Sequence, residues 1–222
     1  MFVHLDTITP VELKTIEGPK GRFYVTPEGN KYPSITTILG SGEKPWLADW
    51  RNSLGNERAD REMKRSADRG TAVHLMIERF LDNESNVTRD QKIEHVTEFN
   101  TLRLHLKNIN NILTQETPLW SDLLRCAGRV DCVGEWQGKL SIIDFKTSTN
   151  NKTAEMIDSY WMQTTAYAIM FQERYGIQID QAVIIMSVER GAVPLVFKRD
   201  IDPYIQPLLK TINTYHKSKG TK

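Results

Sequence analysis

The sequence predicts an α/β domain in which a mixed β-sheet is flanked by helices and preceded by a helical N-terminal lobe. Two observations predict this fold class. Hydrophobic residues at helical spacing dominate the first half of the chain, and strand-like apolar runs follow it. In the second half of the chain, the predicted elements come in the order three strands, a helix, two strands and a helix. A chain of 222 residues can bury a substantial core, so we expect one domain, with a hairpin and helical lobe over 1–110 and a mixed-sheet core over 111–222.

The N-terminal part predicts a hairpin and a short helix. The first twenty residues carry little pattern. Residues 22–25 and 31–32 read as two short strands around a turn-rich insert. Pro33 and Ser34 then open a helix that runs through Leu39, and Ser34 is the expected N-cap.

Helical spacing predicts three helices in the lobe, over Pro45–Leu54, Glu57–Arg69 and Thr71–Leu81. The first carries Trp46 and Trp50 on one stripe, and we expect at least one of them to lie in the core. The second is polar nearly all round, which is typical of a solvated helix with many ion pairs. The alternative is a local basic surface for phosphates. The cations of that surface would be Arg51, Arg58, Arg61, Lys64 and Arg65.

A long amphipathic helix is predicted over Asp90–Leu113, with Thr88 and Gln91 as a capping box. The segments that follow alternate between strand and helix patterns. The strands are predicted over Thr114–Trp120, Cys126–Trp136, Lys139–Lys146, Gln181–Val188 and Val193–Lys198, and the helices over Thr153–Tyr175 and Pro203–Lys217.

Composition excludes several classes of protein. The net charge is +1, so a nucleic-acid surface must be local rather than global. Cys126 and Cys132 lack the spacing of a zinc or iron–sulfur site, and we expect two buried thiols on one face of a strand, in a reducing compartment. The sequence shows no signal peptide and no apolar run of membrane-spanning length, which predicts a soluble, cytoplasmic protein.

The most informative segments are Gly128–Asp131 and, twelve residues later, Ile143–Thr147. Residues two apart on a strand share a face, so Asp144 and Lys146 point the same way while Phe145 points to the opposite layer. Both segments are apolar around their charges, and charges at the ends of buried strands need a partner, a metal or a function. Two carboxylates beside a lysine suit a hard divalent cation and a hydrolytic water. The alternative is a solvated surface pair.

Four segments in this order resemble the RecB-like branch of the PD-(D/E)xK nuclease superfamily: Gly70–His74, Gly128–Asp131, Asp144–Lys146 and Gln163–Tyr167. Within that branch, Tyr32–Thr36 followed by the Trp-rich helix is similar to phage exonucleases and mitochondrial genome maintenance exonucleases. The proline that nominally opens the superfamily motif is absent. The chain also lacks the four-cysteine cluster of some relatives and the phosphate-binding motif of a helicase motor.

The resemblance implies a restriction-endonuclease-like core in a single nuclease domain. It implies that His74, Asp131, Asp144 and the backbone carbonyl of Phe145 bind Mg²⁺ or Mn²⁺. It also implies that Lys146 positions the attacking water, and that Gln163 and Tyr167 brace the site or touch the DNA backbone. Glu78 and Glu116 would be outer contributors. The residues assigned to catalysis are Asp131, Asp144, Lys146, His74, Gln163 and Tyr167.

The expected activity is a metal-dependent DNA exonuclease that acts on single-stranded ends in replication, recombination or repair. Its partners would be DNA and proteins of those processes, and it would be phage-encoded and act in the host cytoplasm. The helical lobe over 43–82 would border the path of the strand, with Trp46 or Trp50 stacking on bases. The alternatives are a non-catalytic nucleic-acid-binding or adaptor module on the same fold, and a structure-specific endonuclease.

Overall fold

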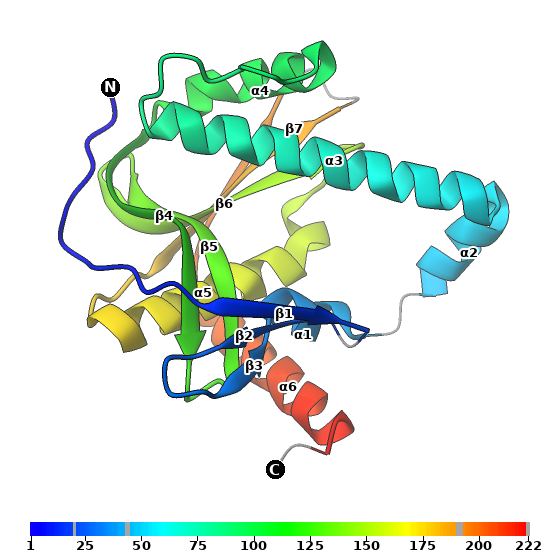
Figure 1. Ribbon diagram of the computed structural model, residues 1–222, viewed down its shortest axis with the longest axis vertical. Coiled ribbons are helices and arrows are strands. Elements are labelled where there is room, and N and C mark those ends of the chain that lie inside the picture. The colour runs from blue at the N-terminus through cyan, green and yellow to red at the C-terminus, as the bar shows by residue number, and fades with distance from the viewer. Residues whose placement is uncertain (20, 43–44, 190–192, 221–222) are drawn as a thin grey trace.

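A mixed five-stranded sheet forms the centre of the protein in the computed structural model, which describes residues 1–19, 21–42, 45–189 and 193–220 (Figure 1). The strands are β4 (Ile109–Ser121), β5 (Cys126–Trp136), β6 (Lys139–Ser148), β7 (Gln181–Val188) and β8 (Leu195–Asp200), in that spatial order. Only β6 and β7 run parallel; the other neighbours are antiparallel. This arrangement confirms the predicted mixed sheet.

Helices cover both faces of the sheet (Figure 1). One face carries α5 (Asp158–Tyr175), which follows a 3₁₀ turn over Ala154–Ile157, together with α6 (Asp202–Ser218) and the short α1 (Ile35–Gly40). The other face carries α3 (Asn56–Leu81) and α4 (Ile93–Leu106), while α2 (Pro45–Leu54) extends from the far end of α3. None of the helices in the described ranges is both long and apolar enough to span a membrane.

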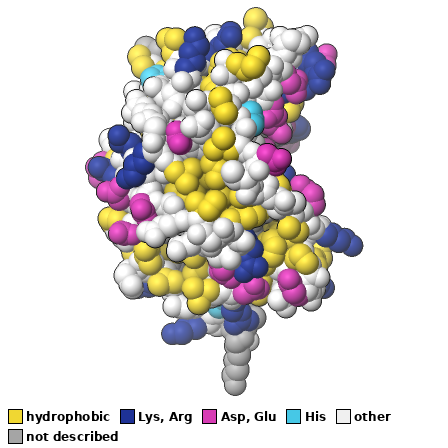
Figure 2. All heavy atoms as spheres, turned by 90° about the vertical axis from the view of Figure 1, so that its left-hand side faces the viewer, with side chains coloured by type: hydrophobic (Ala, Val, Ile, Leu, Met, Phe, Trp, Pro, Cys, Tyr) yellow, Lys and Arg dark blue, Asp and Glu magenta, His cyan; other side chains and the backbone are white. Residues whose placement is uncertain are grey.

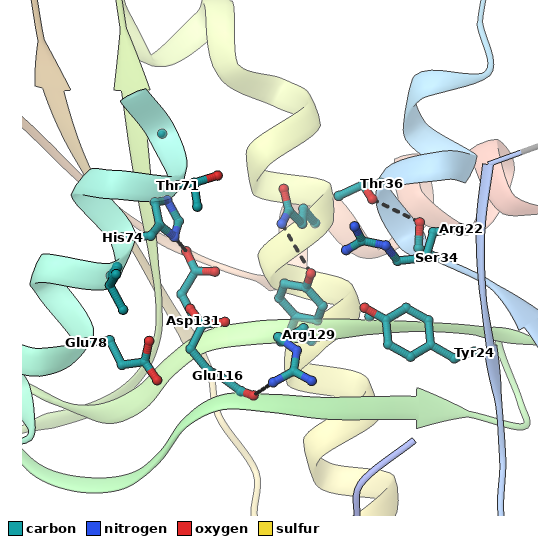
Figure 3. Close-up of a pocket in the computed structure, with 15 residues that line it drawn as sticks. Arg22, Tyr24, Ser34, Thr36, Thr71, His74, Glu78, Glu116, Arg129 and Asp131 are labelled. Atoms are coloured by element: carbon teal, nitrogen blue, oxygen red, sulfur yellow. Dashed lines mark hydrogen bonds and ion pairs between the residues drawn. The ribbon is translucent and has the colours of Figure 1, made fainter. Parts of the chain in front are cut away.

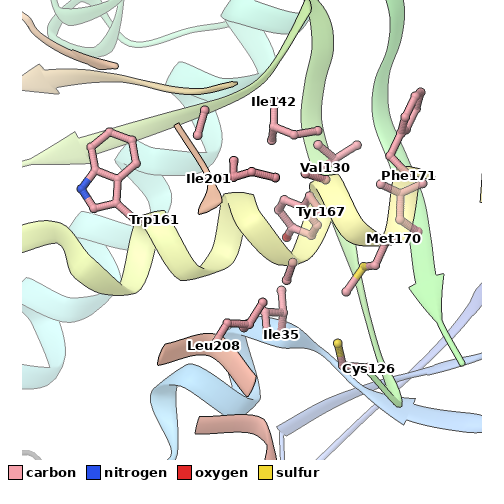
Figure 4. Close-up of a cluster of buried hydrophobic side chains, with 14 of the residues drawn as sticks. Ile35, Cys126, Val130, Ile142, Trp161, Tyr167, Met170, Phe171, Ile201 and Leu208 are labelled. Atoms are coloured by element: carbon pink, nitrogen blue, oxygen red, sulfur yellow. The ribbon is translucent and has the colours of Figure 1, made fainter. Parts of the chain in front are cut away.

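The two helical layers bury two separate hydrophobic clusters. The cluster under α5 contains Trp161 and Phe171, and it packs against Val130 and Ile142 of the sheet (Figure 4). The cluster under α3 and α4 is built on the opposite face, from residues such as Phe99. Each face of the sheet therefore has its own hydrophobic cluster. At the edge of the sheet, helices of both layers can contribute side chains to one site.

The long predicted helix over Asp90–Leu113 is wrong at both ends. Helix α4 starts at Ile93 with Lys92 as N-cap and without a side-chain cap, so the predicted capping box of Thr88 and Gln91 does not form. The helix ends at Leu106, and Ile109 begins β4. The apolar residues after Leu106 keep a helical spacing. They form a strand nevertheless, because their backbone pairs with β5 and with the N-terminal segment.

Helix α3 is continuous, although two helices were predicted on either side of Gly70. A glycine costs a helix only about 1 kcal/mol relative to alanine, and the apolar face of the second half packs into the core. Packing against the core therefore keeps the helix continuous at Gly70. The residue Gly55, with φ of 79°, is where the chain turns from α2 into α3.

A second, three-stranded sheet precedes the helices and extends the predicted hairpin. It consists of β1 (Lys14–Gly18), β2 (Gly21–Val25) and β3 (Lys31–Pro33), all antiparallel. The unpatterned residues before it run along the side of the main sheet, where Val3 and Leu5 bond to the backbone of Ile112. Figure 2 shows this side, on which hydrophobic side chains gather near the centre. The exposed apolar residues of the segment are Met1, Val3, Leu5 and Val11.

The arm formed by α2 and the first half of α3 is polar and ion-paired. Trp46 is 64% exposed and Trp50 is half-buried, so the expectation that one of them lies in the core is wrong. Arg51 bonds to Asp60 at 2.7 Å, and Arg61, Lys64 and Arg65 of α3 also pair with nearby carboxylates. Those pairs are Arg61–Glu57, Lys64–Asp68, Arg65–Glu62 and Arg65–Glu189. Residues 43 and 44 of the predicted 43–82 lobe lie outside the described ranges.

Cys126 and Cys132 are both buried and free, as expected, and burial raises the pKa of both thiols. They do not share a face, however. Cys126 packs in the cluster under α5, whereas Cys132 packs in the cluster under α3. Alternation is broken between Val130 and Val133, which pack in the same cluster under α5, so Cys132 lies on the opposite face from Cys126.

Candidate active site

The candidate site lies where β5 and β6 separate. Their antiparallel pairing ends at Cys132 and Ile143, while β6 stays paired with β7 through Ser148. The backbone N–H of Phe145 therefore has no strand partner on the β5 side, and it donates to Asp131 Oδ2 at 2.7 Å. The N–H and C=O of one strand residue point to the same side, so the Phe145 carbonyl also faces this fork.

Asp144 and Lys146 project from β6 toward α5 and form an ion pair, while Phe145 packs in the cluster on the other face. This is the alternation that the sequence predicted. The ammonium group of Lys146 also lies 5.1 Å from the ring centre of Tyr160 on α5. Asp144 is fully buried, and its Oδ1 has no hydrogen-bond partner among the described residues. A buried carboxylate oxygen without a partner costs free energy, so it indicates a missing ligand.

His74 reaches the fork from the opposite helical layer. Its Nδ1 lies 3.8 Å from Asp131 Oδ2, and its ring meets Phe145 edge-on at 6.2 Å between centres. Gly70 lies one turn before His74, in the part of α3 that packs against the sheet. A Cβ at Gly70 would lie 3.6 Å from Thr147 Oγ1, an ordinary contact, so the approach does not require glycine.

Glu116 enters the site from β4 through an unusual backbone conformation. Its φ is 45°, in the left-handed region that non-glycine residues rarely adopt, and Arg129 donates to its carbonyl oxygen. In the register of β4 and β5, Glu116 stands opposite Asp131. Ligand atoms of His74, Glu116 and Asp131 all lie within 4.8 Å of one another. Glu116, expected only as an outer contributor, is therefore as close to the fork as His74.

A cavity of about 530 Å³ opens onto these residues (Figure 3). Acidic groups and His74 occupy one end, and the other end is formed by the small sheet and α1. That second end contributes Arg22, Tyr24, Ser34 and Thr36. The resemblance gave no role to Arg22, Tyr24 or Arg129. Arg22 and Tyr24 reach the cavity because the small sheet packs beside it, and Arg129 reaches it by alternation along β5. Their convergence on one cavity becomes visible only in the folded chain.

Gln163 and Tyr167 line the cavity from α5, one turn apart, and the Gln163 amide donates to the Tyr167 hydroxyl at 3.3 Å. Tyr167 fits over Gly128 of β5. A Cβ at Gly128 would lie 2.7 Å from Tyr167 Cε1 and 3.2 Å from Ile35 Cγ2. The glycine that opens the Gly128–Asp131 motif is thus required by packing between the sheet and α5.

Burial and like charge raise the pKa of two acids in the fork, Glu116 and Asp144. For Glu116, burial and then the charge of Asp131 raise the pKa to about 8. Burial also raises the pKa of Asp144, and Asp131 adds to this while Lys146 opposes it. Burial disfavours the charged form of Lys146, but Asp144 and Asp131 outweigh it, and its pKa is raised. The fork therefore holds more negative charge than one lysine neutralises.

The residues of the fork fit a divalent cation. Carboxylate and carbonyl oxygens suit Mg²⁺ and Mn²⁺, and an imidazole is a further ligand for Mn²⁺. Asp144 Oδ1 lacks a partner, and Asp131, Glu116 and His74 offer ligand atoms at mutual distances that one ion can bridge. A cation would relieve the repulsion that raises the pKa values of Glu116 and Asp144.

Comparison with known proteins supports this chemistry. A sequence profile of the PD-(D/E)XK nuclease superfamily matches residues 93–194. The chain is related to the PD-(D/E)XK nucleases. This confirms the resemblance that the motifs predicted, and the sheet confirms the predicted PD-(D/E)XK core. The matched segment contains Asp131, Asp144, Lys146, Gln163 and Tyr167, whereas His74 and the small sheet precede it.

Three curated relatives of the chain are mitochondrial genome maintenance exonucleases 1. The mouse (Mus musculus) and human (Homo sapiens) proteins are each 25% identical over 73% of this chain, which covers 52% and 51% of their lengths. The Xenopus tropicalis protein is 23% identical over 86% of this chain and 59% of its own. The chain thus spans about half the length of the mammalian relatives. The crystal structure of SSO0001 aligns over 85% of this chain and 76% of its own, at 13% identity and a TM-score of 0.46.

Proposed function

We propose that the protein is a metal-dependent DNA exonuclease that hydrolyses phosphodiester bonds at the ends of single-stranded DNA. The observation that carries the proposal is the fork, where Asp131, Asp144 and Lys146 lie beside His74, and where Asp144 keeps a buried oxygen without a partner. The relatives are named as exonucleases of genome maintenance, which supports nuclease chemistry with DNA as the substrate.

The proposed ligands of the metal are His74, Asp131, Asp144 and the backbone carbonyl of Phe145, with Glu116 as a further candidate. Mg²⁺ or Mn²⁺ bound there would neutralise charge on the scissile phosphate and lower the pKa of a water molecule. Asp131 is held for this role by the N–H of Phe145, and Asp144 by the side chain of Lys146.

Lys146 acts as a fixed positive charge. Its ion pair with Asp144 keeps the ammonium protonated, so it is suited to orient the attacking water and to stabilise negative charge in the transition state. Gln163 and Tyr167 are bonded to each other at the cavity wall and would brace the site or contact the DNA backbone.

The single strand is proposed to run along the arm of α2 and α3, with Trp46 available for stacking on a base. Phosphate contacts by the arm would have to displace the carboxylates that pair with its cations. Exposed ion pairs are worth only about 0–1 kcal/mol, so this exchange is feasible. Replication, recombination or repair is the proposed setting, with proteins of those processes as partners.

The test is digestion of single-stranded and double-stranded oligonucleotides labelled at either end, with Mg²⁺, with Mn²⁺ and with excess EDTA. Progressive shortening of the single strand from an end, only in the presence of metal, is the expected result. Closed circular single-stranded DNA should resist. Rapid nicking of the circle would identify an endonuclease instead, and binding of DNA without cleavage under any metal would identify a non-catalytic module.

A further inference from the structure

A second pocket lies at the edge strand β3, away from the fork. Its volume is about 240 Å³, and it is enclosed by the small sheet, by the turn between β4 and β5, and by the last turns of α6. Its lining residues are Phe23, Lys31, Tyr32, Pro33, Arg125, Tyr215, His216 and Lys219. Arg22 and Tyr24, which flank Phe23 on β2, line the active-site cavity. Because successive strand residues point to opposite faces, β2 separates this β3–α6 pocket from the active site.

The β3–α6 pocket is basic and aromatic. Three of its lining residues, Lys31, Arg125 and Lys219, are cationic, and no carboxylate of the described residues lines it. The active-site cavity differs, because Glu78, Glu116 and Asp131 line it. Lys31 and Lys219 are exposed, and neither pairs with a described carboxylate. This distinguishes them from Arg51, Arg61, Lys64 and Arg65 of the helical arm, which do.

Two aromatic side chains of the pocket, Tyr32 and Tyr215, are held in place by neighbouring groups. The Tyr32 hydroxyl donates to Asp122 Oδ1 at 2.8 Å, and Asp122 in turn pairs with Arg174 at 3.1 Å. The ring of Tyr215 meets His216 edge-on at 5.5 Å, and Lys219 Nζ lies 5.8 Å from the centre of the same ring. The Nε2 of His216 is buried without a hydrogen-bond partner among the described residues.

We propose that the β3–α6 pocket binds one nucleotide unit of single-stranded DNA outside the active site. The base packs against Phe23 and Tyr32, and the phosphate is contacted by Lys31 and Lys219. Fixed aromatic faces with cations and no acid are the features by which proteins bind single strands regardless of sequence. The identity of the strand as DNA rests on the proposed function, but the pocket's binding chemistry does not depend on the fork.

The test measures binding rather than cleavage, so that it does not depend on the nuclease activity. The full-length protein is titrated into fluorescein-labelled dT20 in EDTA, and anisotropy is followed at several salt concentrations. Phe23→Ala should weaken binding by about 5-fold or more, as loss of one stacked base does. Lys31→Ala should lower the slope of log K against log salt by about 0.7, the value for one single-strand phosphate contact. Lys210→Ala, an exposed lysine of α6 outside the pocket, is the control.

Photocrosslinking locates the contact independently of affinity. A dT20 strand in which single thymines are replaced by 5-iododeoxyuridine should crosslink to the peptides that contain Phe23, Tyr32 or Tyr215. Parent-like affinity and salt slope in both variants, absence of those crosslinks, or no binding of the strand by the parent would each overturn the proposal. Displacement of the strand by free dTMP at equal concentration would also overturn it, by assigning the pocket to mononucleotides. Failure of metal-dependent cleavage alone would overturn the proposed function and leave the pocket assignment standing.

Discussion

Asp144 is the residue on which metal binding depends most, because its carboxylate is fully buried with one oxygen unpaired. We expect Asp144→Asn to reduce metal-dependent cleavage by more than about 100-fold, since loss of even an outer partner of a metal ligand costs about 10–100-fold. The amide is the same size, so the circular dichroism spectrum should not change. Asp6→Asn, at an exposed carboxylate of the N-terminal segment that lines neither pocket, is the matched control and should cleave like the parent.

Lys146 is expected to act on turnover rather than on binding. Lys146→Met keeps the length of the side chain but removes the charge proposed to stabilise the transition state, and only interactions stronger in the transition state change the chemical rate. Single-turnover cleavage at saturating protein should slow strongly while the Kd for DNA in EDTA changes little. A normal single-turnover rate with weakened binding would assign Lys146 to substrate binding.

Gly128 tests how tightly the sheet packs against α5. Gly128→Ala should destabilise the fold by about 1–3 kcal/mol, the usual cost of overpacking, because its Cβ would lie 2.7 Å from Tyr167. Gly18→Ala, at a position with open space around it, is the control. Urea unfolding measures both. Equal stability of the two variants would show that Tyr167 moves aside without cost.

At the residue scale, the sequence predicted the groups whose positions follow from alternation along one strand. Asp144, Phe145 and Lys146 alternate as expected, and Asp131 meets them at the point where β5 and β6 separate, by accepting the Phe145 N–H. Two classes of site residue could not be predicted from the sequence. Glu116 enters through a positive φ, which is a property of the folded backbone. The cavity residues of the small sheet are brought in by packing between distant segments, which no local pattern encodes.

At the scale of elements, ion pairs join α3 to the end of β7. Arg65 and Arg69 both bond to Glu189, just after β7, and Arg69 is buried. The bond to Arg65, followed by the charge of Arg69, holds the pKa of Glu189 below its usual value. A carboxyl whose pKa is lowered on folding stabilises the protein above its ordinary pKa, and this contribution is lost as the pH falls through the folded pKa.

Glu189→Gln should therefore lower the Tm at pH 7 by a few degrees, where 1 kcal/mol corresponds to about 2–4 °C in a chain of this size. The difference from the parent should shrink as the pH falls below about 4, and it should vanish below the lowered pKa of the folded Glu189 carboxyl, where the parent is also neutral. Thermal melts between pH 3 and pH 7 measure this. A difference that stays constant with pH would mean that charge does not hold α3 at this point.

Most of the elements were predictable, and the errors share one cause. Ile109 and Leu113 continue the helical spacing of Phe99 and Leu106, so periodicity alone extends α4 too far. Strand pairing is a contact between distant segments, and it places Ile109 opposite Trp136 of β5. The continuity of α3 past Gly70 has the same origin, because core packing outweighs the small cost of one glycine.

At the scale of the whole molecule, the site exists because the two helical layers meet where β5 and β6 separate. Helix α3 supplies His74 from one layer, and α5 supplies Gln163 and Tyr167 from the other. The sheet supplies Asp131 and Asp144 between them. Neither layer alone could surround the fork, so the geometry of the site depends on the stability of the complete domain.

Metal should therefore stabilise the whole fold. Burial and the charge of Asp131 raise the pKa of Glu116 and of Asp144, so a cation that neutralises this charge binds the folded state preferentially. At 100 times its Kd, a ligand of the folded state adds about 2.7 kcal/mol. With about 2–4 °C per kcal/mol, Mn²⁺ should raise the Tm by roughly 5–10 °C over EDTA. Asp144→Asn should lose most of this shift, whereas Asp6→Asn should keep it. A parent Tm that is the same in Mn²⁺ and EDTA would contradict a metal at the fork.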